Sequence, residues 1–81
     1  MQDNTLTLKT PIEHKGHTYS TLTMREPRVR DTVIADKQGG TDAEVEIRIF
    51  ANLCEVPPAV VENMAMRDYR GLQSIYEGFL S

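Results

Sequence analysis

The sequence predicts an α+β fold: a small single domain in which an N-terminal β-hairpin is followed by three to four short helices. Three observations support this prediction. Polar and apolar residues alternate, with many threonines, in the first 25 residues, as they do in half-buried strands. After them, apolar residues recur at the spacing of a helix face. The length of 81 residues leaves room for one domain, 1–81, and none for a second.

The hairpin is expected over about residues 4–25. Leu6 and Leu8 share one face of a first strand, which Pro11 is expected to end. Gly16 supplies the conformational freedom that a reversing chain needs, within a loop of several residues. An isolated hairpin is only marginally stable in water, so the helices that follow must pack on it.

The second strand raises a question of register. Leu22 and Met24 share one face of this run, whereas Tyr19 falls on the other face. Either the register slips along the hairpin, or the Tyr19 ring covers the open side of the sheet.

Helices are expected at four places after the hairpin. Pro27 can occupy the first turn of the first helix, in which Val29 and Val33 share one face. Pro58 can begin the third helix in the same way, and Asp68 can cap the last one. The apolar stripe of the last helix consists of Tyr69, Leu72, Ile75, Tyr76, Phe79 and Leu80. The expected bounds are about 27–37, 41–55, 58–66 and 68–80.

The stretch from Thr41 to Glu55 fits two structures. Residues 44–49 alternate polar and apolar, which is typical of a strand. However, Thr41 and Glu44 have the spacing of a capping box, and a run of about 14 residues exceeds a typical strand. A helix is therefore favoured, although the pattern alone leaves the strand open. In a helix, Glu46 falls inside the apolar arc, so its carboxylate is either paired or part of a surface that meets a partner.

Charge is uneven along the chain, whose net charge is −3. Residues 1–40 carry a net +1 and residues 41–81 a net −4. The one basic cluster, Arg25, Arg28 and Arg30, is expected to pair with the acidic second half, and no nucleic acid is expected as the main partner. No apolar run reaches the ~18 residues of a membrane span, and the start of the chain lacks a basic region. A soluble, cytoplasmic protein is therefore expected, with no membrane partner.

Residues that could carry chemistry are few. His14 and His17 have H-x-x-H spacing, but nothing completes the three or four ligands of a zinc site. Cys54 is the only cysteine, so an internal disulfide is excluded, and its apolar neighbours predict a buried thiol. Gly39 and Gly40 lack the lysine of a phosphate-binding loop. The sequence therefore predicts a protein that is not an enzyme, with no catalytic residues, no cofactor and no metal.

The order of the features along the chain is also informative. It comprises the strand pair, the turn Met24-Arg25-Glu26-Pro27, a short helix containing Asp31, a Gly-rich break, a helix ending in Leu53, a Pro-marked turn, and the late series Asp68-Tyr69, Leu72 and Phe79-Leu80. In this order and spacing, about residues 5–80 resemble the small phage tail assembly chaperones of the Mu-like and P2 E-like kind. The glycine that this family often has just after the middle helix is Glu55 here.

The resemblance implies a role in building the tail of a phage or prophage, in the host bacterial cytoplasm and outside the mature virion. Such chaperones coat the tape measure protein, a long and largely helical ruler, and keep it soluble until the tail tube protein assembles around it. In many of these systems a ribosomal frameshift produces a longer form of the chaperone, which recruits the tube protein. A homo-oligomer is left open.

The side chains that could cover such a client are surplus apolar residues of the middle and last helices. Ile47, Phe50, Tyr69 and Tyr76 are the candidate partner-binding residues, and the alternative is that they simply form the core. Two other functions are left open. One is a small phage or prophage DNA-binding regulator, and the other is a minor structural protein of the tail or the head–tail junction.

Overall fold

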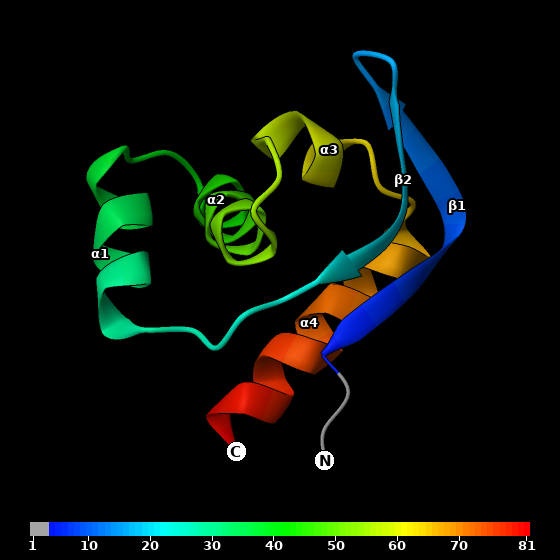
Figure 1. The fold of residues 1–81 in the computed structure, drawn as a ribbon. Coiled ribbons are helices and arrows are strands. Elements are labelled where there is room, and N and C mark those ends of the chain that lie inside the picture. The colour runs from blue at the N-terminus through cyan, green and yellow to red at the C-terminus, as the bar shows by residue number, and fades with distance from the viewer. Residues whose placement is uncertain (1–3) are drawn as a thin grey trace.

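The computed structural model describes residues 4–81 and has the predicted α+β architecture (Figure 1). The first three residues of the predicted 1–81 domain lie outside this description. Two antiparallel strands come first and helices follow: β1 (Thr5–His14), β2 (His17–Thr23), α1 (Val29–Lys37), α2 (Asp42–Cys54), α3 (Pro58–Glu62) and α4 (Met66–Leu80). Figure 1 shows α4 along the hairpin and α2 in the middle, with α1 on the side of α2 away from the strands.

The hairpin reverses in a two-residue turn, so the prediction of a loop of several residues is wrong. Lys15 and Gly16 both adopt positive φ, 50° and 79°, and His14 pairs directly with His17. Two-residue turns with positive φ at both positions match the right-handed twist of paired strands. The turn therefore needs no further residues.

The register slips along the hairpin, which is one of the two alternatives left open for Tyr19. Thr7 pairs with Thr21, and Ile12 pairs with Tyr19, so β1 advances five residues while β2 advances two. The extra residues change the face that Tyr19 presents, and its ring packs half-buried against the core. Pro11 lies inside this irregular stretch of β1, where its missing N–H breaks no regular pairing. The prediction that Pro11 ends the strand is therefore wrong.

The irregular stretch of β1 is held by Asp68 of α4. The backbone N–H groups of Lys9 and Thr10 donate to the two carboxylate oxygens of Asp68, each at 3.0 Å. Burial alone would raise the pKa of the Asp68 carboxyl, but these hydrogen bonds and the charge of Arg67 lower it overall. Asp68 was predicted to cap α4, yet the helix begins at Met66 and the carboxylate, 3% exposed, points to the strand instead. Strand N–H groups that lack a sheet partner explain this difference.

Helix α4 also approaches β1 closely at Gly71. A Cβ atom built on Gly71 would lie 2.7 Å from Cδ1 of Leu6, so a larger residue would force the Leu6 side chain to move. Together, Gly71 and Asp68 hold α4 along the hairpin.

Helix α2 resolves the ambiguous stretch in favour of a helix. Thr41 Oγ1 accepts from the Glu44 N–H at 3.2 Å, and a Glu44 carboxylate oxygen accepts from the Thr41 N–H at 2.9 Å. This is the predicted capping box. At the other end, Glu55 adopts a left-handed conformation with φ 57°, and the next N–H, of Val56, donates to the Ala51 carbonyl at 2.9 Å. A glycine would adopt this conformation without strain.

Helix α1 begins at Val29 and not at Pro27 as predicted. The Asp31 carboxylate accepts from the backbone N–H of Arg28 at 2.8 Å, which places Arg28 immediately before the helix. An acidic third residue that binds back to the preceding N–H is a recurrent start of helices. The carboxylate, and not the proline, therefore sets the first turn.

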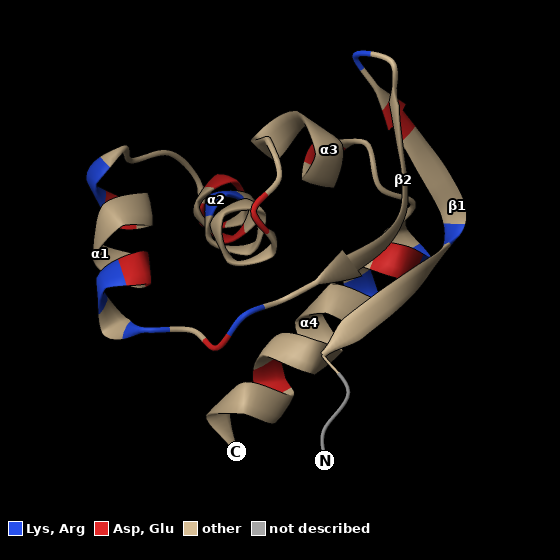
Figure 2. Cartoon of the chain, viewed as in Figure 1, with Lys and Arg blue, Asp and Glu red and all other residues tan. Residues whose placement is uncertain are grey.

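The Asp31 carboxylate also joins α1 to α2 and to the preceding linker, residues 24–28. The Arg25 guanidinium donates to both oxygens, at 2.8 and 3.1 Å, and the Asn52 amide donates at 3.0 Å. The Arg25 guanidinium holds the pKa of the Asp31 carboxyl below its usual value, against the opposing effect of burial. Arg25 therefore pairs within the first half of the chain, where the linker carries both signs of charge (Figure 2). For this residue, the predicted pairing with the acidic second half is wrong.

The face of α1 that was predicted to be apolar points to solvent. Val29 and Val33 are 82% and 48% exposed, whereas Asp31 and Ala35 form the buried face. Asp31 is bonded to α2, and Ala35 lies one turn further along the same side of the helix. Anchoring the carboxylate to α2 therefore turns the two valines outward.

Helices α3 and α4 meet at a break that changes their predicted bounds. Helix α3 ends at Glu62, four residues earlier than expected, and α4 begins at Met66, two residues earlier. At the end of α3 the side-chain amide of Asn63 donates to the Ala59 carbonyl at 2.7 Å. The backbone N–H of Asn63 donates to the same carbonyl at 3.2 Å. The next N–H, of Met64, reaches back only three residues, to the Val61 carbonyl at 3.1 Å, so the regular helix ends here.

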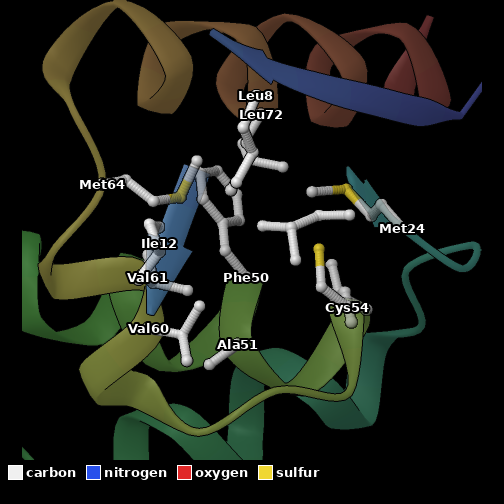
Figure 3. Packing of buried hydrophobic residues seen from close by; sticks show 12 residues of the cluster. Leu8, Ile12, Met24, Phe50, Ala51, Cys54, Val60, Val61, Met64 and Leu72 are labelled. Carbon is white, nitrogen blue, oxygen red and sulfur yellow. The ribbon is translucent and has the colours of Figure 1, made fainter. Parts of the chain in front are cut away.

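The core lies where the hairpin, α2, α3 and α4 meet (Figure 3). Helix α1 contributes no residue to this cluster. Cys54 belongs to it, as predicted, and burial raises the pKa of its thiol to about 11, so the thiol stays protonated and unreactive at neutral pH. The buried members are Leu8, Ile12, Leu22, Met24, Phe50, Ala51, Leu53, Cys54, Val60, Val61, Met64 and Leu72.

Replacing Glu55 with glycine is expected to stabilise the protein. Relief of the left-handed backbone is worth about 1–2 kcal/mol, and the greater freedom of glycine in the unfolded chain costs about 0.4–1 kcal/mol. The net gain in the free energy of unfolding is therefore about 0.5–1 kcal/mol, measured by urea denaturation. Glu55→Ala, which removes the carboxylate but keeps a Cβ atom, is the control and should show no gain. Equal effects of the two substitutions would contradict the backbone explanation.

Asp68→Asn is expected to lower the free energy of unfolding by about 1–3 kcal/mol at pH 7, because an amide leaves one strand N–H without an acceptor. The pKa of Asp68 is lowered by folding, so its stabilisation is complete above the unfolded value of about 3.9 and is lost as pH falls through the folded value. Urea denaturation at pH 7 and pH 3 should therefore show a smaller difference between variant and wild type in acid. Glu77→Gln, exposed on the same helix, should change stability little at either pH. A variant as stable as wild type at pH 7 would refute the role of the Asp68 contacts.

Candidate partner-binding surface

The structure brings together three of the four predicted partner-binding residues. The Phe50 ring of α2 lies 5.5 Å from that of Tyr69 and 5.3 Å from that of Tyr76, centroid to centroid, and both tyrosines belong to α4. Phe50 is 1% exposed and is part of the core. The solvent-exposed surface of this cluster therefore comes from the two half-buried tyrosines. Ile47, the fourth residue, is half-buried against the same core.

The Glu46 carboxylate is hydrogen-bonded within the chain, which is one of the two alternatives that its position left open. The Tyr69 hydroxyl donates to Oε1 of Glu46, and the Gln73 amide donates to the same oxygen at 2.9 Å. Burial raises the pKa of the Tyr69 hydroxyl, and the adjacent carboxylate raises it further. Both partners of Glu46 are neutral, so they satisfy its oxygen without balancing its charge.

A groove of about 230 Å³ runs beside this cluster, on the side of α2 that lies between α1 and α4. Apolar side chains from α2 and α4 cover part of its wall: Val45, Ile49, Phe50 and Tyr76. Carboxylates line the rest, namely Asp36 of α1 with Asp42 and Glu46 of α2. We call this feature the acidic groove. It combines apolar contact area with negative charge. Its shape depends on the position of α1, which contributes Asp36.

A second groove, of about 250 Å³, lies elsewhere between α1 and α2 and differs in its electrostatics. Its lining includes Asp31 and Arg48, and both are already engaged within the chain. Asp31 binds Arg25 and Asn52, while the Arg48 guanidinium donates to the carbonyl groups of Ala35 and Gly39. Its charged groups are therefore engaged within the chain, whereas no carboxylate of the acidic groove forms an ion pair within residues 4–81.

Sequence reasoning did not identify the acidic groove. Glu46 was placed inside the apolar arc of α2, but Asp36, another carboxylate of the groove, lies on α1. The one signal available in the sequence was the excess of acidic residues in the second half. Their gathering beside an apolar surface depends on how α1 packs on α2.

The described part of the chain, residues 4–81, contains no group of three or more His, Cys, Asp or Glu side chains arranged to hold a metal ion. His14 and His17 face each other across the strand pair, and His17 contacts the Tyr19 ring, with centroids 4.5 Å apart. None of the helices described over residues 4–81 is both long and apolar enough to cross a membrane.

Comparison with known proteins agrees with this description. Searches of curated proteins and of solved structures gave no match. A family model described as "Phage tail assembly chaperone proteins, E, or 41 or 14" matches residues 5–81, which is nearly the whole chain. This family is of a chaperone type and is not an enzyme family. With strands, helices and Pro-marked turns all inside the matched range, the chain belongs to the phage tail assembly chaperone family.

Proposed function

We propose that this protein binds the tape measure protein of its phage or prophage and keeps it soluble during tail assembly, without catalysis. The family match over residues 5–81 carries the proposal. The structure supports it with apolar surface that the fold leaves uncovered: the wall of the acidic groove and the exposed valines of α1. A long helical client would aggregate through similar surfaces, and grooves between helices are suited to cover them.

The predicted partner-binding residues divide into two kinds under this proposal. Tyr76 lines the acidic groove and can touch a client, with Phe50 supporting it from below. Tyr69 does not line the groove, and it contributes indirectly because its hydroxyl donates to the Glu46 carboxylate. Ile47 contributes through the apolar surface of α2 next to the same cluster.

The proposal also includes a location for the protein and further binding partners. It acts in the host bacterial cytoplasm and is absent from the mature virion. A longer, frameshifted form of the chain and the tail tube protein are its further partners, and it can work as a homo-oligomer. The family to which the chain belongs supports protein partners in tail assembly, and these particular partners are our proposal.

Co-expression with the adjacent tape measure gene tests the function directly. The tape measure protein is expected to move from the pellet into the soluble fraction when this chain is present, quantified by immunoblot against an empty-vector control. Tyr76→Ala should reduce that soluble fraction several-fold, since it removes a ring from the groove. Tyr19→Ala, also a half-buried tyrosine but on the hairpin, is the matched control and should leave solubility unchanged.

Two results would count against the proposal. If the tape measure protein is equally insoluble with and without this chain, the chaperone function fails. If Tyr19→Ala impairs solubility and Tyr76→Ala does not, the client lies on the hairpin side and the assignment of the surface fails. Circular dichroism of both variants separates loss of binding from loss of folding.

A further inference from the structure

The acidic groove holds negative charge that the protein does not balance. Within residues 4–81, the only ion pair joins Arg25 to Asp31, well away from the carboxylates of this groove. Glu46 is bonded by a phenol and an amide, which carry no charge. Arg48, the single basic residue of α2, donates to backbone carbonyls. None of the three carboxylates therefore forms an ion pair within residues 4–81, and all three are available to an external cation.

The apolar part of the groove indicates what kind of group carries that cation. Val45 and Ile49 lie four residues apart on one face of α2, and the Tyr76 ring lies across from them on α4. Rows of this kind accept the apolar stripe of another helix, whose side chains recur at the same spacing. The volume of about 230 Å³ is below the roughly 300–1,000 Å³ of small-molecule sites, so side chains of a protein partner fit better than a separate ligand.

We propose that the acidic groove binds a helical segment of the client in which an apolar stripe is flanked by Lys or Arg residues. This inference rests on the proposed function and specifies which part of the client the chaperone selects. The apolar stripe packs on Val45, Ile49 and Tyr76, and the flanking cations approach Asp36, Asp42 and Glu46. Opposite charges at the edge of an interface speed association and reject segments of the wrong sign.

A second copy of this chain is a weaker occupant on the same grounds. Each copy carries a net charge of −3, with −4 in residues 41–81, so two copies meeting at this groove would bring like charges together. A client segment rich in Lys and Arg removes that repulsion. The test below includes self-association as an outcome.

Two synthetic amphipathic helical peptides provide the probe, each fluorescently labelled and with one leucine stripe. In one peptide the stripe is flanked by lysines, and in the other by glutamates. We expect the full-length protein to bind the lysine-flanked peptide at least about tenfold more tightly in fluorescence anisotropy at low salt, and the preference to shrink as NaCl screens the charges.

A pair of charge-matched variants locates the effect. Asp36→Asn with Asp42→Asn is expected to weaken binding of the lysine-flanked peptide by about fivefold to tenfold, since each rim pair is worth up to about 1 kcal/mol and tenfold is about 1.4 kcal/mol. Glu13→Gln with Glu62→Gln changes the net charge equally at exposed positions outside the groove, and should have little effect. Both double variants are checked for folding by circular dichroism.

Three outcomes would overturn the inference: no preference between the peptides, equal loss in the two double variants, or a change in self-association by analytical ultracentrifugation in place of a change in peptide binding. The co-expression experiment distinguishes these from failure of the chaperone function. If wild type and the Asp36→Asn, Asp42→Asn variant keep the tape measure protein equally soluble, the function stands and the groove assignment falls. If wild type does not keep it soluble, the function itself falls.

Discussion

One buried carboxylate, that of Asp31, determines how the outer part of this molecule is arranged. It receives the backbone N–H of Arg28, the guanidinium of Arg25 and the amide of Asn52, and so joins the linker, α1 and α2 at one point. A carboxylate that is 3% exposed is stable there because each of these donors replaces a lost bond to water. Both grooves on α2 have α1 as a wall, so they depend on this site, together with the bonds from Arg48 to the Ala35 and Gly39 carbonyls.

The opposite side of the molecule is organised by a comparable contact. Asp68 takes up two strand N–H groups in the irregular stretch of the hairpin, and Gly71 lets α4 lie against Leu6. The core then fills the space between α2 and the hairpin (Figure 3). The protein thus uses the two acidic residues Asp31 and Asp68, both buried, as internal connectors.

Local patterns predicted much of the fold from the sequence. The capping box of Thr41 and Glu44 identified α2 correctly, because both partners lie within one turn and need no tertiary information. The roles of Pro11 and Asp68 could not be predicted, because they depend on a register slip between strands. The acidic groove was not predictable for a similar reason. Asp36 reaches it only when α1 packs on α2, and that packing involves the bonds of Asp31 and Arg48 between the two helices. Sequence order identified the family, and three-dimensional contacts were needed to locate a surface.

Helix α1 has a further consequence for the groove that it borders. Apart from Asp31 and Ala35 its residues are exposed, and it adds nothing to the main core, so its detachment requires little loss of buried apolar area. Segments of this kind open at lower free energy than the rest of a domain. The acidic groove therefore has one permanent wall, supplied by α2 and α4, and one adjustable wall. A groove built in this way can widen for bulky side chains and close over small ones, which fits the helical client that we propose.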